Sequence, residues 1–260
     1  MVAEQPVAAS RSSSQRRRVA ILGVAIDDVN ENEALALAEA MIHHGGPHQI
    51  CTVNPEFVVE AGRNPAFAAT LAGADLCTPD GFGVLLAARY LGTPLRGRVT
   101  GVELVRRLAA LAAEQGYRIF LLGAGPGVAE AAAAVLRQAH PGLQVVGCFG
   151  GSPAPHHEPF LRQLIRAARP DILLVAYGHP RQDLWIARNQ PELGVPLALG
   201  VGGTFDYLAG RVPRAPAWLR RLGLEWLYRL MRQPQRWQRI FEAVPYFMWL
   251  VIRDQPRKPL

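Results

Sequence analysis

The stretch RIFLLGAGPGVAEAAAAVLRQAHPGLQVVGCFG, residues 118–150, decides the fold class, because it joins an apolar strand, a glycine-rich turn, a helix and a second apolar strand. Strands without polar alternation are typical of parallel sheets, which helices cover on both faces. The alternation goes on in DILLVAYG (171–178), the helical RQDLWIARNQP (181–191) and PLALG (196–200). This order predicts an α/β fold.

The first half of the chain has the same alternation. We expect a strand and a turn at 18–29, a helix at 31–44, a strand at 48–53, helical segments at 55–74 interrupted near Asn64 and Pro65, and a short strand at 75–79. The predicted architecture is a Rossmann-like parallel or mixed sheet in two lobes, residues 19–115 and 116–210, with helices on both faces.

Charge divides the 260-residue chain further. Residues 1–18 carry +3, residues 19–210 carry −4, and residues 211–260 carry +8. Residues 1–18 lack the apolar core of a secretory signal, so we expect a disordered basic leader and a cytoplasmic protein. No run of about 18 uncharged apolar residues occurs, which disfavours a spanning helix. The three cysteines have no CxxC spacing, so neither a disulfide framework nor a zinc site is indicated.

Polar residues and glycines stand at the carboxyl ends of several predicted strands: Thr52 and Asn54, Asp80, Gly123, Gly178 and His179, and the segment from Gly200 to Asp206, which includes Gly203. Ligands of parallel α/β sheets bind beyond the carboxyl ends of the strands. These residues are therefore expected to line one cleft.

The turn formed by Gly123, Gly125 and Gly127 has the spacing GxGxG and not the GxGxxG of dinucleotide-binding proteins. The following strand also ends without an acidic residue for a ribose. A nicotinamide cofactor is disfavoured, and two interpretations remain: a tight strand-to-helix turn, or a loop that holds a nucleotide diphosphate. No GK[ST] sequence occurs, and the single lysine is Lys258, so a Walker-type loop is excluded.

Asp80 lies between Pro79 and Gly81, where an aspartate either bonds its own turn or acts as a catalytic carboxylate at a strand end. His179 is a candidate base or a polar surface group. The sequence has no HExxH, no DxD and no His/Cys cluster, so no metal is indicated.

The tail, residues 211–260, holds four of the five tryptophans, interleaved with arginines at helical spacing. Such a basic and aromatic helical segment is typical of an element that binds the surface of an anionic membrane. A helical hairpin packed on its own core and a nucleic-acid patch are the alternatives, and no RNA-binding fold accompanies the tail.

From about residue 19 to residue 250 the chain resembles the bacterial WecG/TagA/CpsF glycosyltransferases (glycosyltransferase family 26). The strings that carry the resemblance are TVNPEFVVEA, ADLCTPDGFGVLLAARYLG, RVTGVEL, FLLGAGPGVAE, PDILLVAYGHPRQDLWI, GVGGTFDYLAGRVPRAP, GLEWLYRL and QPQRWQR. The resemblance implies transfer of a sugar, commonly N-acetylmannosamine, from UDP to a polyprenyl-diphosphate-linked saccharide. It implies inversion at the anomeric carbon, no metal or other cofactor, and a peripheral position on the inner face of the cell membrane.

The resemblance also assigns residues. Asp80 is implied as the catalytic base, and the substrate-binding residues are implied to include Thr52, Asn54, Arg98, Gln182, Arg229, Arg236 and Arg239. Three positions depart from the family pattern, Glu103, Asp183 and Gln233, and they leave the donor sugar open.

These residue types suit an inverting transfer, in which one carboxylate removes the proton of the acceptor hydroxyl. Departing UDP needs cations or a helix N-terminus, which the glycine turn and the tail arginines could supply. UDP-glucose and UDP-N-acetylmannosaminuronic acid remain alternative donors, and a non-catalytic membrane-associated assembly factor and a nucleotide-dependent oxidoreductase remain alternative functions. A homo-oligomer is possible, and no nucleic-acid partner is expected.

Overall fold

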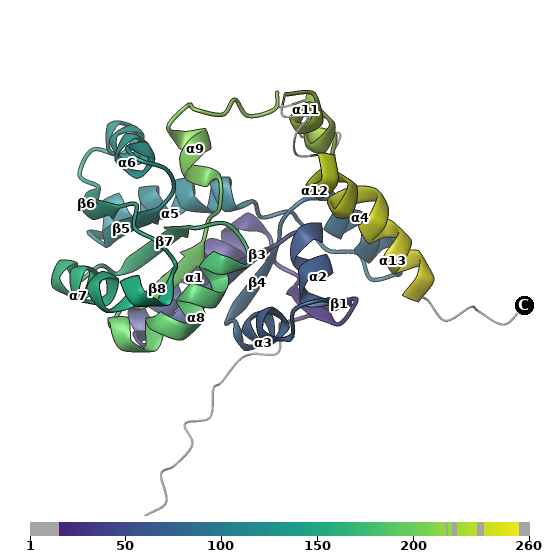
Figure 1. Ribbon diagram of the computed structural model, residues 1–260, viewed down its shortest axis with the longest axis horizontal. Coiled ribbons are helices and arrows are strands. Elements are labelled where there is room, and N and C mark those ends of the chain that lie inside the picture. Colours follow the sequence, from purple (N-terminus) through teal and green to yellow (C-terminus); the bar gives the residue numbers. More distant parts are fainter. Residues whose placement is uncertain (1–15, 217, 220–222, 233–236, 255–260) are drawn as a thin grey trace, which may run out of the picture.

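The computed structural model describes residues 16–216, 218–219, 223–232 and 237–254. Its centre is a sheet of six strands, all parallel, in the order β4-β3-β8-β7-β5-β6 (Figure 1). The strands are β3 (His48–Val53), β4 (Leu76–Pro79), β5 (Arg118–Gly123), β6 (Gln144–Phe149), β7 (Ile172–Ala176) and β8 (Leu197–Gly200). The predicted α/β fold with a parallel sheet is confirmed.

Both halves of the chain contribute to this one sheet. β8, from the second half, pairs with β3 of the first half and with β7. The two expected lobes therefore share a continuous sheet, and the carboxyl ends of all six strands lie at the same edge.

Helices cover the two faces of the sheet because side chains alternate along each strand. Ile119, Leu121, Ile172 and Leu174 belong to a core cluster with one set of helices: α1 (Glu31–His44), α5 (Gly101–Gln115), α6 (Val128–Ala139) and α9 (Thr204–Leu208). The next residues along the strands, such as Phe120 and Leu173, face the other way. That face is covered by α2 (Pro55–Ala61), α3 (Pro65–Gly73), α4 (Phe82–Tyr90), α7 (Glu158–Ala168) and α8 (Arg181–Leu193). The 3-10 turn η1 (Pro155–His157) leads into α7.

Residues 18–29 differ from the expected single strand. They form an antiparallel hairpin of β1 (Arg18–Ile21) and β2 (Val24–Asp27) outside the main sheet. Leu22 and Gly23 turn the chain with φ of 49° and 82°, the positive values of a tight two-residue hairpin turn. Asp27 at the end of β2 accepts the Cys77 amide at 2.8 Å, which pairs a donor at the edge strand β4.

The tail is helical, as expected, with α11 (Glu225–Arg232), α12 (Trp237–Phe241), the π-helical turn η3 (Glu242–Tyr246) and α13 (Phe247–Asp254). Phe247 and Val251 of α13 are buried in the same cluster as Val84 of α4. Self-packing therefore accounts for one face of α13. Within the described ranges, no helix has the length and apolar content needed to cross a bilayer.

Candidate active site

Asp80 lies directly after β4, at the carboxyl edge of the sheet. Its amide donates to the Val53 carbonyl at 2.8 Å, which fixes the turn beside β3. Its Oδ2 accepts the Gly101 amide at 3.3 Å, at the first residue of α5. A carboxylate at the N-terminus of a long helix is stabilised in its ionised form. Asp80 is half-buried and lies at the edge of the predicted cleft.

Thr52 and Thr204 gather at the same helix start. A side-chain carbon added to Gly101 would lie 3.6 Å from Thr52 Oγ1 and 3.7 Å from Thr204 Oγ1. Both threonines are buried, with 6% and 3% exposed. The start of α5 thus brings together the ends of β3 and β4 and the start of α9.

Asn54 and Arg98 flank Asp80. Asn54 caps α2, because its Oδ1 accepts the Phe57 amide at 3.2 Å, and its Cβ would lie 3.7 Å from a side chain on Gly81. Arg98 is half-buried, and its neighbour Val99 donates to the Pro79 carbonyl at 2.8 Å. Both residues therefore lie in the chain segments adjacent to Asp80.

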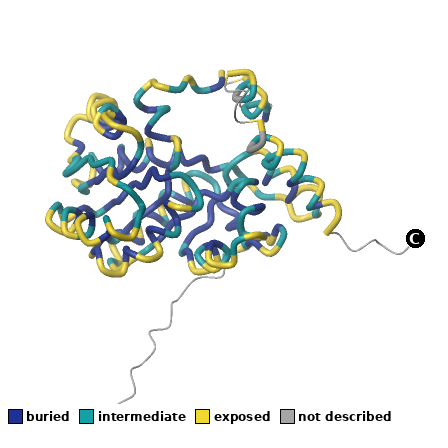
Figure 2. The backbone as a smooth tube through the Cα atoms, in the orientation of Figure 1, coloured by how far each residue is buried: buried dark blue, intermediate teal, exposed yellow. Residues whose placement is uncertain are grey.

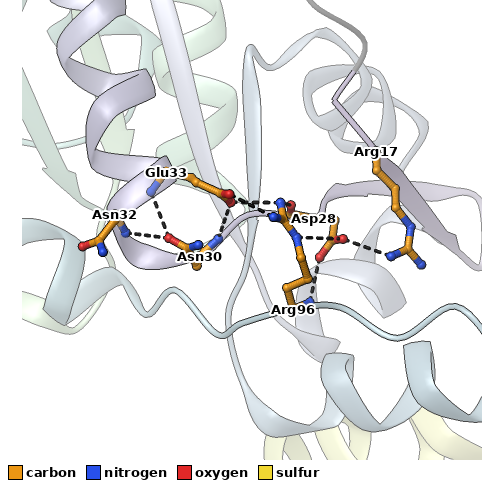
Figure 3. Close-up of polar contacts among 6 residues, drawn as sticks. All are labelled: Arg17, Asp28, Asn30, Asn32, Glu33 and Arg96. Atoms are coloured by element: carbon orange, nitrogen blue, oxygen red, sulfur yellow. Dashed lines mark hydrogen bonds and ion pairs between the residues drawn. The ribbon is translucent and has the colours of Figure 1, made fainter.

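The loop that carries Arg98 is anchored by a cluster of charges (Figure 3). The Arg96 amide donates to Asp28 Oδ1 at 2.7 Å, and the Arg96 guanidinium pairs with Asp28 Oδ2 at 3.2 Å and with Glu33 at 2.9 Å. Arg17 also pairs with Asp28 at 3.1 Å. Asn30 caps α1 and exchanges hydrogen bonds with Glu33 in a capping box. The sequence interpretation missed this cluster.

Gln182 lies at the start of α8 and is 2% exposed. Its Oε1 accepts the amides of Gly178 at 3.1 Å and Gly202 at 3.0 Å. Gln182 thus connects the loop after β7 with the loop after β8. That second loop contains Gly203, which is exposed and precedes α9, and Asp206, which is half-buried in the first turn of α9.

The glycine turn follows β5, which is separated from β3 and β4 by β7 and β8 in the sheet. Gly123 has a φ of 100°, and a side-chain carbon there would lie 2.8 Å from the carbonyl carbon of Ala176. Gly125 and Gly127 continue the turn into α6. Arg211 Nη2 donates to the Pro126 carbonyl at 3.3 Å, which places a cation at the turn.

Arg214 is a second cation that the sequence interpretation did not single out. Its Nη2 donates to Thr100 Oγ1 at 3.4 Å, beside the helix start that Asp80 contacts. Arg211 and Arg214 both belong to the string GVGGTFDYLAGRVPRAP. Two arginines shortly after a glycine-rich turn are the sequence feature that could have indicated these cations.

The tail arginines are less completely described. Arg229 lies in α11 and Arg239 in α12, and their side chains are outside the described part of the chain, as is all of Arg236. Among the described residues, no three His, Cys, Asp or Glu side chains form a group that could hold a metal ion.

His179 lies near the start of α2. Its Nε2 is 3.3 Å from Glu56 Oε2, and its ring stacks on Phe57 with the centroids 5.1 Å apart. The His179 and Glu56 side chains are 16% and 23% exposed. His179 therefore packs against the start of α2 and is not a freely solvated surface group.

A family model and several known proteins match most of the chain. Residues 19–259 match the family model described as "Glycosyl transferase WecG/TagA/CpsF family". A relative from Bacillus spizizenii is 34% identical over 206 residues, 79% of this chain and 79% of the relative. One from Bacillus subtilis is 31% identical over 209 residues, 80% of each chain. One from Staphylococcus aureus (strain MW2) is 30% identical over 251 residues, 92% of this chain and 94% of the relative.

Each of these three relatives is named "N-acetylglucosaminyldiphosphoundecaprenol N-acetyl-beta-D-mannosaminyltransferase". The match to the family model extends over the sheet, its carboxyl edge and the tail helices. The chain therefore belongs to the WecG/TagA/CpsF family of glycosyltransferases.

Proposed function

We propose that the chain transfers N-acetylmannosamine from a UDP carrier to a saccharide linked to polyprenyl diphosphate, in the biosynthesis of a cell-surface polysaccharide. The names of the relatives, which specify this sugar and a diphosphoundecaprenol acceptor, support the proposal. The observation that carries it is the contact between Asp80 and the Gly101 amide at the carboxyl edge of the sheet.

In this proposal Asp80 is the general base of an inverting transfer. The acceptor hydroxyl oxygen attacks the anomeric carbon as its proton moves to Asp80 and as the bond to the UDP oxygen breaks. The Gly101 amide favours the ionised carboxylate that this role requires. In the proposal Thr52, Asn54 and Arg98 orient the acceptor, and the Asn54 side chain is held in place because its oxygen caps α2.

The departing UDP carries negative charge, which needs a fixed cationic environment. We assign this role to the glycine turn at the start of α6 together with Arg211, whose guanidinium contacts that turn. The tail arginines Arg229, Arg236 and Arg239 complete the clamp in the proposal. These groups make the transfer independent of a metal ion.

A lipid-linked acceptor requires the enzyme to work at a membrane. We propose that the chain is peripheral on the cytoplasmic face of the cell membrane and that residues 211–260, with a charge of +8, contact anionic lipids.

Calorimetry with UDP, in the presence and absence of EDTA, tests the proposed donor site. Micromolar binding that survives EDTA supports it, and a screen of UDP-N-acetylmannosamine, UDP-glucose and UDP-N-acetylmannosaminuronic acid with a lipid-linked N-acetylglucosamine acceptor then identifies the donor. Folded protein that binds no UDP, with or without vesicles, contradicts the proposal and favours a non-catalytic assembly factor.

A further inference from the structure

Exposed large apolar side chains gather at one end of the molecule. Among the described residues, all of them except Val135 and Phe160 lie on α4 or after residue 217. The tail members are Trp218, Leu227, Met231, Trp237, Phe241, Trp249 and Ile252. Figure 1 shows α4 and the tail helices α11, α12 and α13 at the same end, and Figure 2 shows exposed positions along the outer side of α13.

The α4 residues form a row. Phe82, Leu86 and Tyr90 are 43%, 43% and 49% exposed and follow one another at intervals of four residues, so they share one face of the helix. Val84 and Ala87 on the opposite side are buried in the core. An apolar row on the outer face of a core helix exceeds the scattered apolar residues of an ordinary surface and marks a contact site.

This row is continuous with the tail. Phe247 and Val251 of α13 are buried in the cluster that contains Val84 and Ala87, so α13 packs beside α4. At the other end of the tail, the Phe82 ring lies so close to Gly223 that no side chain fits there. The helix α4 therefore has the tail as a direct neighbour at α13 and at Gly223.

Cations accompany the apolar residues. The Arg253 guanidinium lies 5.1 Å from the centre of the Trp249 ring, and Arg89 and Arg232 are exposed on α4 and α11. Arginine beside tryptophan suits the boundary between anionic headgroups and acyl chains. The +8 charge of residues 211–260 also opposes the approach of the same surface of a second copy.

We propose that the outer face of α4 forms, with the tail, one docking surface for an anionic lipid bilayer. The inference deepens the proposed function and rests on it, since a lipid-linked acceptor is the reason to dock. Phe82 is two residues after Asp80, so the bilayer lies beside the candidate base and the acceptor diphosphate needs to rise little from the membrane.

The test uses the full chain and vesicles of phosphatidylcholine and phosphatidylglycerol. The double variant Leu86→Ser, Tyr90→Ser removes two members of the row, and Phe160→Ser is the matched control, since Phe160 is 53% exposed on α7. We expect the double variant to lose about tenfold or more in vesicle affinity. The control is expected to bind vesicles as the wild type does, and both proteins should keep the wild-type melting temperature and UDP affinity.

Vesicle affinity unchanged in a folded double variant overturns the inference. A double variant that instead changes from an oligomer to a monomer, with vesicle binding intact, overturns it in favour of a contact between copies. Failure of the proposed function is distinguishable, because it appears as absence of UDP binding in the wild type, whereas the α4 inference is read from vesicle binding.

Discussion

Gln182 and Gly202 are joined by a hydrogen bond of 3.0 Å in which the glycine amide donates to the side-chain oxygen. The same oxygen accepts the Gly178 amide at 3.1 Å. One buried carboxamide thus holds together the loops that follow β7 and β8. Gly202 is followed by Gly203 and by Thr204, whose hydroxyl lies near Gly101, so the position of Gln182 bears on the site that contains Asp80.

Leucine has a side chain of similar size to glutamine but no hydrogen-bond acceptor. Replacing Gln182 by leucine therefore leaves the Gly178 and Gly202 amides without this partner. A buried amide that loses its partner costs about 1–3 kcal/mol of stability. We expect Gln182→Leu to lower the free energy of unfolding by about this amount, measured in urea, and to reduce kcat/KM for transfer. Gln163→Leu makes the same change at an exposed position of α7 and is expected to leave both unchanged. Wild-type stability in Gln182→Leu would contradict the assigned role.

Gly123 and Gly142 offer a matched pair for the glycine turn. Their φ values are 100° and 98°, but a side chain at Gly123 meets the Ala176 backbone, whereas one at Gly142 meets nothing within 4 Å. Both alanine variants carry the strain of a positive φ, of about 1 kcal/mol. Gly123→Ala adds overpacking of about 1–3 kcal/mol. Thermal melts of both variants measure the difference, and equal melting temperatures would show that the β5–β7 contact does not restrict this turn.

Asp183 links stability to pH. Burial raises the pKa of its fully buried carboxyl to about 7 in the folded protein, from about 4 in the unfolded chain. The folded state therefore binds more protons between these values, and the free energy of unfolding falls as pH rises from about 4 to 7. We expect Asp183→Asn to lose this part of the pH dependence and to be more stable than the wild type at pH 8. Urea unfolding at several pH values measures the effect, with the exposed Asp254→Asn as control. Parallel curves for Asp183→Asn and wild type would contradict it.

Variants of Arg96 and Arg17 distinguish a role in positioning the site from a role in stability alone. Both pair with Asp28, but Arg96 belongs to the loop that leads to Arg98 and Thr100, whereas Arg17 precedes β1. We expect Arg96→Ala to reduce transfer activity because that loop loosens, and Arg17→Ala to retain activity. Transfer rates measured well below the melting temperature of each variant test the difference. Equal activity in the two variants would mean that the Arg96 cluster does not position the site.

The sequence predicts the sheet well because its strands are short apolar runs that end at glycine or polar residues. It does not predict the β1–β2 hairpin, since Leu22 adopts a positive φ without any local signal for it. At the site, the strand ends indicated Asp80, Thr52 and the Gly200–Asp206 segment. The cluster of Asp28 with Arg96 was not predictable, because these residues are 68 positions apart and meet through the tertiary fold alone.

The same limit applies to the residues around Asp80. Gly101 and Thr204 acquire their importance because the starts of α5 and α9 converge on the end of β3, a relationship that no sequence spacing reveals. The implied residues Thr52, Asn54 and Arg98 lie near Asp80 in the structure. Their contacts with substrate remain predictions.

The most direct test of the account is the rate of sugar transfer by Asp80→Asn to a lipid-linked N-acetylglucosamine acceptor. Asparagine keeps the size of the side chain and cannot take up the proton of the acceptor hydroxyl. With UDP affinity and melting temperature close to those of the wild type, we expect kcat to fall by about 100-fold or more. A folded, UDP-binding Asp80→Asn protein with a kcat within a few-fold of the wild type would contradict the assignment of Asp80 as the base.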